Sequence, residues 1–441
     1  MNIKRKFYLD ELTKRMHNGR TKIITGIRRC GKSHLLFVTF KQFLLEQKVK
    51  KERIIEISLD DATQKALTNP LVLSEFIRSK IKDNSWHYVL IDEIQECLKI
   101  RNPDIDPKTI APEDKEKCFI TFYNVLNGLE RIPNVDVYVT GSNSRMLSKD
   151  IATDFRGRGD VLQIHPFSFS EYLETSGLSE SKAFGNYLRY GGLPLSVLAS
   201  DNRERERYLK NLFNEIYLRD IVERNKLKSD YVIGKLCDVL SSAVSSLTNP
   251  HKLVNSLMSS LGVKTTDKVI KRYLDFLEES FIFSKTARFD VKGKHHLDYP
   301  SKYYAEDVGL RNARLNFRQQ EETHLMENVI FNELMRRGYS VDVGVIFANS
   351  FVNGKHVVKQ HEIDFVVNDA SGKVYVQSAF RIDDENKRLH ETEGMLKIRD
   401  SFRKIVVIGG ESEPWTDENG ITYVGVIPFL LDEKILDKAM I

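Results

Sequence analysis

Short apolar runs alternate with longer amphipathic stretches over residues 21–165. The runs KIIT, RIIEISL, HYVLI, VDVYVT and DVLQI have the length of buried strands, and the stretches between them have helical periodicity. This alternation is typical of a parallel sheet with helices on both faces. We therefore predict an α/β domain over residues 1–166.

Helical periodicity replaces the strand pattern between about residues 166 and 285. Two short helices are predicted from apolar faces made by Leu253, Val254, Leu257 and Leu261, and by Val269, Ile270, Tyr273, Leu274 and Leu277. The strand-like runs FIFSKTARFD and KHHLDYP follow, and this order fits a winged helix with a two-stranded wing. We therefore predict a helical and winged-helix module over residues 167–317. Strand patterns at 341–347, 362–367, 374–379 and 404–408 predict a third, mixed α/β domain over residues 318–441.

The stretch GIRRCGKS, residues 26–33, satisfies the pattern G-x-x-x-x-G-K-[ST] between a predicted strand and a predicted helix. In such a loop the backbone amides surround phosphate oxygens, the lysine reaches the β- and γ-phosphates, and the hydroxyl binds Mg²⁺. Lys32 and Ser33 are therefore the expected ligands of ATP and Mg²⁺. The remaining expected contacts to nucleotide come from Gly26, Ile27, Arg28, Arg29, Cys30, Gly31 and His34. For Arg28 and Arg29, contact with a neighbouring subunit or with acidic residues is an equal alternative.

The run HYVLIDEIQE places Asp92 and Glu93 at the end of an apolar strand. We expect Asp92 to hold Mg²⁺ through water and Glu93 to polarise the water that attacks the γ-phosphate. An Asp-Glu pair is common at strand ends, and its weight comes from the phosphate loop upstream. Together the two motifs predict ATP hydrolysis rather than nucleotide binding alone.

Polar residues also follow the strand VDVYVT. Ser142 or Asn143 could hydrogen-bond the attacking water or the γ-phosphate, although a glycine-containing turn explains either residue equally well. Farther on, DFRGRGD contains Arg158, which could stabilise charge on the transferred phosphoryl group in its own subunit or in a neighbour. A surface arginine is the more common explanation for Arg158.

Composition adds limits rather than a function. The chain has 67 Lys and Arg against 62 Asp and Glu in 441 residues, a net charge of +5 that permits a local basic surface but does not predict nucleic-acid binding. No apolar run approaches the roughly 20 residues of a membrane span, and the N-terminus lacks a signal-peptide core, so we expect a cytoplasmic protein. The four cysteines lack C-x-x-C spacing and predict neither disulfides nor a zinc site.

The runs HEIDFVV and VYVQSAF are predicted as adjacent strands in the third domain. A restriction-type nuclease site needs a helix glutamate, here Glu327 or Glu333, then Asp364, and then Glu-x-Lys on the next strand. Gln377 and Ala379 stand where that glutamate and lysine belong. We therefore expect this domain to bind or to scaffold rather than to cut.

Two substitutes for the missing groups stay open. Glu362 shares a strand face with Asp364 and could add a carboxylate, and Lys387 or Arg388 on the following helix could supply the cation. Neither substitute restores the full site. Nuclease chemistry is the least favoured of three functions, behind an ATPase machine and a nucleotide-switched DNA-binding or defence-type module.

Several segments together resemble the bacterial and archaeal AAA-type ATPases that carry a C-terminal domain of unknown function. They are, in chain order, IITGIRRCGKSHLL, YVLIDEIQE, VTGSNSRMLS, FRGRGDVLQIHPFSFSEY, YLRYGGLP, LRDIVER, KRYLDFLEESFIF and KYYAEDVGLRNARLN. The resemblance implies a P-loop core with strand order 5-1-4-3-2, a winged helix and a C-terminal domain similar to restriction endonucleases in fold. GGLPL also resembles the G-L-P-L segment of signal-transducing NTPases, which implies that Pro194 senses the nucleotide, with a helix break as the equal alternative.

The expected partners follow from the same features. The second helix of the predicted winged helix carries Lys264, Lys268, Lys271 and Arg272, which could meet DNA phosphates. A lid or a subunit contact is favoured over DNA, because the helix is not unusually basic. A homo-oligomer, DNA bound by the winged helix or the C-terminal domain, and an unidentified protein client are the candidate partners, and no membrane is expected.

Overall fold

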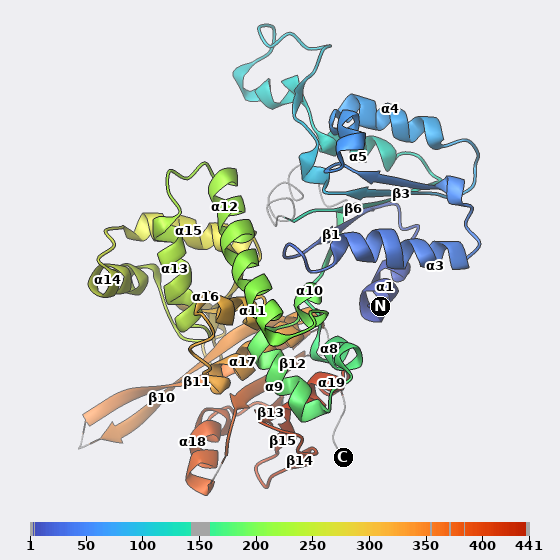
Figure 1. Cartoon of the computed structure of the whole chain (residues 1–441). Coiled ribbons are helices and arrows are strands. Elements are labelled where there is room, and N and C mark those ends of the chain that lie inside the picture. The colour runs from blue at the N-terminus through green and yellow to red at the C-terminus, as the bar shows by residue number, and fades with distance from the viewer. Residues whose placement is uncertain are drawn as a thin grey trace. The chain divides into compact units, whose positions relative to one another are not determined.

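The computed structural model describes residue 3 and residues 5–142, 159–352, 355–369, 372–382 and 384–437. The chain folds into two compact units, residues 1–164 and residues 165–441. The first unit is built on a five-stranded sheet of β1 (Thr21–Thr25), β2 (Ile54–Ser58), β3 (His87–Asp92), β6 (Val135–Thr140) and β7 (Gly159–Gln163) (Figure 1). All neighbouring strands in this sheet are parallel, in the order β2-β3-β6-β1-β7. Numbered along the chain and read from the other edge, this order is 5-1-4-3-2.

Helices cover both faces of this sheet, with α4 (Pro70–Lys80) and α5 (Phe122–Leu129) on one side and α1 (Lys6–Lys14) and α3 (Lys41–Glu46) on the other (Figure 1). Asn69 and Pro70 begin α4 in the usual way, because the Asn69 side chain accepts a hydrogen bond from the Leu71 amide. Shorter elements complete the unit: α2 (Lys32–His34), η1 (Leu35–Phe40), η2 (Lys51–Arg53), η3 (Ala62–Thr68), η4 (Ile94–Glu96), β4 (Ile100–Arg101), η5 (Pro112–Cys118) and β5 (Phe119–Ile120). The predicted α/β layering is confirmed for the described part of the unit.

The second unit begins with helices, as the periodicity predicts. They are α8 (Phe169–Ser176), α9 (Glu180–Tyr190), α10 (Pro194–Val197), α11 (Asn202–Asn211), η6 (Leu212–Leu218), α12 (Arg219–Arg224), α13 (Tyr231–Ser242), α14 (Pro250–Leu261) and α15 (Asp267–Glu279). Asn249 and Thr266 cap the starts of α14 and α15. The apolar face predicted for α14 is buried except at Leu261, which is exposed because it lies in the last turn before Gly262.

An eight-stranded sheet forms the rest of the second unit. Its strands are β8 (Phe283–Asp290), β9 (His295–Ala305), β10 (Ser340–Val352), β11 (Lys355–Asp369), β12 (Gly372–Ala379), β13 (Arg403–Ile408), β14 (Trp415–Thr416) and β15 (Ile421–Gly425). The order is β14-β15-β13-β12-β11-β10-β8-β9. The hairpin predicted as a wing is thus part of the large sheet, because β8 pairs in parallel with β10 from Arg288 to Asp290. The helices around the sheet are α16 (Val308–Arg314), α17 (Glu322–Arg336), α18 (Glu385–Leu396) and α19 (Val426–Leu431).

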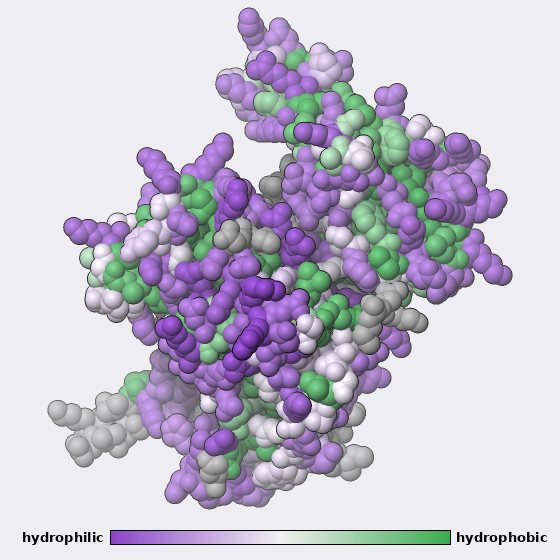
Figure 2. All heavy atoms as spheres, in the orientation of Figure 1, coloured by the Kyte–Doolittle hydropathy of each residue, from purple (hydrophilic) through white to green (hydrophobic). Residues whose placement is uncertain are grey.

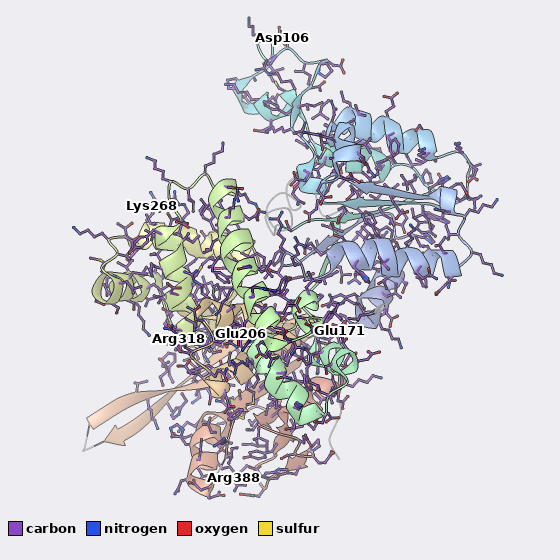
Figure 3. All side chains as sticks on the ribbon, in the orientation of Figure 1. Asp106, Glu171, Glu206, Lys268, Arg318 and Arg388 are labelled. Carbon is purple, nitrogen blue, oxygen red and sulfur yellow. The ribbon has the colours of Figure 1, made fainter. Side chains whose placement is uncertain are left out.

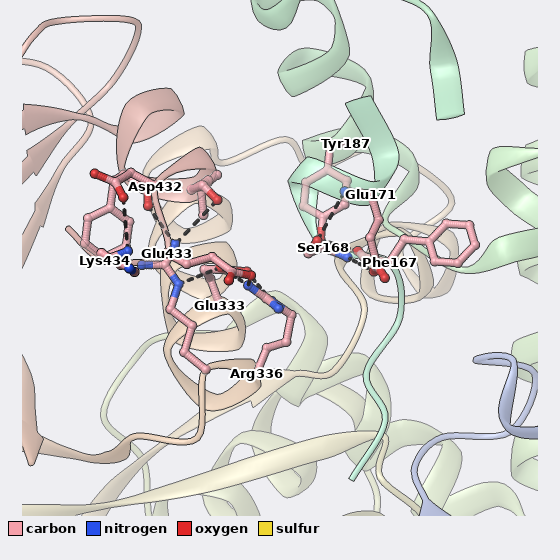
Figure 4. A network of polar contacts seen from close by, with 12 residues as sticks. Phe167, Ser168, Glu171, Tyr187, Glu333, Arg336, Asp432, Glu433 and Lys434 are labelled. Carbon is pink, nitrogen blue, oxygen red and sulfur yellow. Dashed lines mark hydrogen bonds and ion pairs between the residues drawn. The ribbon is translucent and has the colours of Figure 1, made fainter. Parts of the chain in front are cut away.

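Charged side chains tie α17 to the segment after α19 (Figure 4). Arg336 donates to Glu333 at 2.7 Å and to Glu433 at 2.9 Å, and Arg337 also donates to Glu333 at 2.7 Å. Burial raises the pKa of the Glu333 carboxyl, but the two arginines outweigh burial and hold that pKa below its ordinary value. Glu333 is therefore a structural anion and not the helix glutamate of a nuclease site.

The surface and the cysteines agree with the composition. Hydrophilic residues cover most of the face drawn in Figure 2. All four cysteines lie within the described residues, and each is a buried thiol outside any disulfide. Over the described parts of the chain, none of the helices combines the length and the apolar character needed to cross a membrane.

Candidate nucleotide-binding site

The loop between β1 and α2 has a backbone that requires glycine. Gly26 and Gly31 have φ angles of 138° and 100°, which lie in the region that side chains disfavour. A Cβ atom on Gly26 would lie 2.0 Å from the carbonyl oxygen of Ile164, the residue that follows β7. The loop therefore packs directly against the end of the neighbouring strand, and Cys30 fills the remaining space with its Sγ atom 3.5 Å from the same carbonyl.

Lys32 is the first residue of a helix that runs without a break through α2, η1 and α3. Its side chain is buried, with 4% of the residue exposed, and its Nζ atom donates to the carbonyl oxygens of Gly26 at 3.0 Å and Ile27 at 3.1 Å. The amides of Lys32 and Ser33 lie in the first turn, where backbone N–H groups have no acceptor within the helix. An ammonium group and free amides facing one loop suit a phosphate group.

Asp92 and Glu93 lie at the end of β3, and Thr140 lies at the end of the adjacent strand β6. Thr140 Oγ1 donates a hydrogen bond to the Asp92 carboxylate, and the Glu93 amide donates to Thr140 Oγ1 at 3.0 Å. Glu93 has a φ angle of 51°, an unusual left-handed conformation for this residue type. Thr140 therefore fixes both acidic residues from the neighbouring strand.

The Glu93 carboxyl lies in a buried environment that changes its pKa. Burial raises its pKa above the ordinary value, and the nearby charge of Lys32 opposes that rise. A carboxylate with a raised pKa accepts a proton more readily near neutral pH. Gln95 Nε2 donates to Glu93 Oε2 and reaches Ser142 Oγ at 3.5 Å, so Gln95 connects the ends of β3 and β6.

The other expected contacts divide into three groups. Arg28 is half-buried and electrostatically coupled to Glu93, whereas Arg29 and His34 are exposed. Ser142 is buried at the end of β6, beside Gln95. Asn143 and Arg158 lie outside the described residues, and Pro194 begins α10 in the second unit. Their roles, and those of the loop residues toward nucleotide, stay predictions.

Sequence reasoning missed Thr140 and Gln95. Thr140 ends the apolar strand that precedes Ser142, and Gln95 lies two residues after Glu93, so both positions adjoin motifs already identified. A single Thr or Gln has no distinctive spacing. Only the pairing of β3 with β6 brings Thr140 beside the acidic residues, and Gln95 beside Ser142.

The carboxylates discussed for a nuclease site come together in the second unit. Glu327 on α17 and Glu362 and Asp364 on β11 all contact the Nζ atom of Lys302 on β9, at 2.7, 2.8 and 3.1 Å. The sequence predicts such a cation at Lys387 or Arg388, but Arg388 pairs with Glu385 on the surface of α18. Among the described residues, no group of three or more His, Cys, Asp and Glu side chains is arranged to hold a metal ion.

Comparison with known proteins places the first of these sites in a family. Residues 18–173 match the AAA domain, and residues 181–321 match a domain of unknown function, DUF8612. An uncharacterized protein of Haemophilus influenzae is 32% identical over 436 residues, which cover 97% of this chain and 98% of that protein. This chain belongs to the same family. The resemblance to AAA-type proteins is thereby confirmed for the first unit, with a domain of unknown function C-terminal to it.

Two further proteins are similar to this chain at lower identity. The uncharacterized protein MJ1544 of Methanocaldococcus jannaschii is 26% identical over 382 residues, covering 83% of this chain and 76% of that protein. Among solved structures, the ORC1 protein of Aeropyrum pernix in complex with DNA has 11% identity, covers 71% of this chain and 92% of its own, and has a TM-score of 0.29. A TM-score this low supports no conclusion about this chain.

Proposed function

We propose that the chain is a Mg²⁺-dependent ATPase that converts nucleotide state into rearrangement of its two units. The observation that carries the proposal is the buried Lys32, whose Nζ atom donates to two neutral carbonyl groups of its own loop. Among the described residues, no anion accepts a hydrogen bond from Lys32, and a buried lysine without such a partner has unused capacity to bind an anion. The acidic pair Asp92 and Glu93 on the next motif would complete an ATP site.

Each residue has a distinct role in the proposed reaction. The amides of the loop and Lys32 Nζ bind the phosphate oxygens, and Ser33 and Asp92 would hold Mg²⁺, which neutralises charge on those oxygens when bound. Glu93 accepts the proton of the attacking water. Thr140 and Gln95 keep the two carboxylates in place, so the water meets a base of fixed orientation.

A single peptide bond supports the coupling of this site to the second unit. Ile164, the last residue of the first unit, donates its amide to Thr25 O at 2.7 Å and packs its carbonyl on Gly26. The next residue, His165, contacts Glu306 of the second unit through Nδ1 at 2.6 Å. A shift of the phosphate loop would therefore move Ile164, and the next peptide bond would pass this movement to His165 in the second unit.

The test measures ATP turnover by the wild type and by Glu93→Gln, each with and without duplex DNA. The ATPase proposal expects Mg²⁺-dependent phosphate release by the wild type and at least about a 100-fold loss in Glu93→Gln, because the amide cannot accept the proton. Equal turnover by both proteins, or none by either, would overturn it. Coupling is tested separately by the distance between spin labels in the two units, which should change between the ATP-bound and nucleotide-free states.

A second candidate function is nucleotide-switched DNA binding, which the exposed face of α15 favours. Lys264 precedes this helix, and Lys268, Lys271 and Arg272 lie on it, all exposed; Lys268 is labelled in Figure 3. If these residues bind DNA, removal of each charge should weaken binding to all DNA sequences. It should also reduce the slope of the logarithm of the binding constant against the logarithm of the salt concentration by about 1. DNA that changes neither turnover nor affinity for nucleotide would reject this function.

Other parts of the proposal concern partners and place. A homo-oligomer and an unidentified protein client are both compatible with an ATPase that moves its units, and we expect the protein in the cytoplasm. In an oligomer Arg158 could serve a neighbouring subunit, and Pro194 could sense the nucleotide from the second unit. The winged helix and the restriction-endonuclease-like fold remain proposals for the second unit.

A further inference from the structure

Among the described residues, a cluster of buried charged groups around Lys302 has no part in the proposed ATPase. The Lys302 side chain is 3% exposed, those of Glu327 and Asp364 are each 8% exposed, and that of Glu362 is 30% exposed. Four ionisable groups at such depth are rare unless they balance one another. The cluster is therefore built as a unit rather than assembled from surface residues.

Carboxylates from two elements surround the Lys302 ammonium group. An ammonium group has three N–H donors, and three different carboxylates lie within 3.1 Å of Nζ, those of Glu327, Glu362 and Asp364. The contacts with Glu327 and Asp364 are hydrogen bonds, and Glu362 adds an ion pair at 2.8 Å. Lys302 thus takes the central position, where a cation touches every carboxylate, and not the side position of a lysine that orients water.

The carboxylates are held in place by further contacts that point them at this centre. Tyr304 donates to Glu327 Oε1 at 2.8 Å, and the Ser378 amide donates to Asp364 Oδ2 at 3.0 Å. The atoms that face Lys302 are thus fixed from the outside by neighbours on β9 and β12. Removal of the lysine would leave the oxygens directed at one empty point.

Gln377 has a structural explanation in the same arrangement. Its Oε1 atom accepts a hydrogen bond from the Asp364 amide at 3.2 Å. A glutamate at this position would add a fourth carboxylate to a cluster whose central cation carries a single charge. The neutral amide of Gln377 therefore avoids a further negative charge beside Lys302, which carries a single positive charge.

Other ionisable groups lie close to the cluster around Lys302. Arg288 on β8, with 4% of the residue exposed, adds a second positive charge close to Glu362. Burial, and then the charge of Asp364, raise the pKa of the Glu327 carboxyl to about 8, so Glu327 holds a proton at neutral pH. The positive charges of Lys302 and Arg288 thus lie beside the ionised groups of the cluster, and the Glu391 carboxyl is a further acidic group close to Asp364 and Gln377.

We infer that the Lys302 ammonium takes the place of a divalent cation among Glu327, Glu362 and Asp364, so that this site is closed to metal and becomes a metal site only when Lys302 is removed. Divalent ions bind oxygen at about 2.0–2.6 Å, shorter than the lysine contacts of 2.7–3.1 Å. Ca²⁺ needs the smallest inward movement of the oxygens and is the appropriate probe. This inference goes beyond the proposed ATPase and does not depend on it.

The test compares thermal unfolding of the full chain, without nucleotide, in EDTA and in about 1 mM Ca²⁺, a concentration that fills even weak protein sites. The proteins are the wild type, Lys302→Ala and the double variant Lys302→Ala/Asp364→Asn. We expect Ca²⁺ to raise the Tm of Lys302→Ala by about 5 °C and to leave the other two unchanged within about 1 °C. Equal Ca²⁺ responses of Lys302→Ala and the double variant would overturn the inference.

A second measurement needs only stable proteins, in case Lys302→Ala does not fold. Calorimetric titration of the wild type with Ca²⁺ and with Mn²⁺ should find no site in the absence of nucleotide. A site that Asp364→Asn removes, or metal-dependent DNA cleavage that Asp364→Asn abolishes, would contradict the inference, because either result would mean that a metal enters beside the lysine.

Discussion

Lys32 and Lys302 are both buried lysines, and they differ in the groups that accept their hydrogen bonds. Lys32 donates to two neutral carbonyl oxygens of its own loop. Lys302 contacts three carboxylates that come from α17 and β11. The positive charge of Lys32 is therefore available to a ligand, whereas that of Lys302 is already neutralised by the protein. Burial of a charged residue alone does not indicate a binding site; the charge of its partners decides.

The largest expected effect comes from Lys32→Ala. We expect kcat/KM for ATP to fall about 100- to 1,000-fold, because loss of one charged donor to a transferred phosphoryl group removes about 3–4 kcal/mol of transition-state stabilisation. Steady-state phosphate release measures this change. Lys50→Ala, an exposed lysine in the same unit, is the matched control and should keep wild-type turnover. Comparable rates for the two variants would contradict the claim that Lys32 binds the phosphate groups of ATP.

Lys302→Met tests, through the stability of the protein, whether Lys302 neutralises the buried carboxylates. This variant keeps most of the side-chain volume but leaves buried carboxylates without their cation, and we expect it to lower the free energy of unfolding by about 3–5 kcal/mol. Urea unfolding measures the change. Lys359→Met on β11 is the control, because Lys359 pairs with Glu393 at an exposed position, and its loss should cost at most about 1 kcal/mol. Similar losses for both variants would mean that Lys302 is not the centre of a balanced cluster.

Thr140→Val sharpens the assignment of the first site with a smaller effect. The valine keeps the shape of the side chain but removes the hydrogen bond to Asp92 and the acceptor for the Glu93 amide. We expect kcat to fall about 10-fold with little change in the affinity for ATP, because a hydrogen bond to a charged group contributes about 1.5–3 kcal/mol. Thr109→Val, at an exposed position, provides the control. A change in affinity with an unchanged kcat would assign Thr140 to binding.

A further expected effect is a dependence of stability on pH that comes from Glu327. Its pKa is about 8 in the folded chain, raised first by burial and then by Asp364, against an ordinary value of 4.5. The folded state therefore holds a proton that the unfolded state has lost, and this contribution to stability is complete below about pH 4.5 and disappears as the pH rises to about 8. Between these pH values, Glu327→Gln should reduce the slope of the free energy of unfolding against pH by up to about 1.4 kcal/mol per pH unit. Parallel unfolding curves of the variant and the wild type would reject the raised pKa.

The two sites also differ in how far the sequence predicted them. Gly26, Lys32 and Ser33 lie within eight consecutive residues, so their spacing alone places them on one loop, and Asp92 with Glu93 ends a recognisable strand. Lys302 lies 25 residues from Glu327 and 62 residues from Asp364, and no local pattern connects them. Only the pairing of distant strands assembles that cluster. The sequence therefore predicts a nuclease-like site without a lysine, whereas the fold places Lys302 of β9 among the carboxylates.

The same limit explains the outcome for β8 and β9. Their alternating residues predict a hairpin correctly, but an isolated wing and the edge of a large sheet have the same local pattern. The parallel pairing of β8 with β10, from Arg288 to Asp290, decides between them. Pairing of this kind depends on residues far along the chain, at 343–345.

A single-turnover measurement tests the central claim most directly. Protein in excess over radiolabelled ATP and Mg²⁺ is quenched at intervals, and bound ATP and ADP are separated. The wild type should convert its bound ATP to ADP, and Glu93→Gln should bind ATP and retain it at least about 100-fold longer. Conversion at the same rate in both proteins would contradict the assignment of the base, and binding without conversion in the wild type would contradict the ATPase itself.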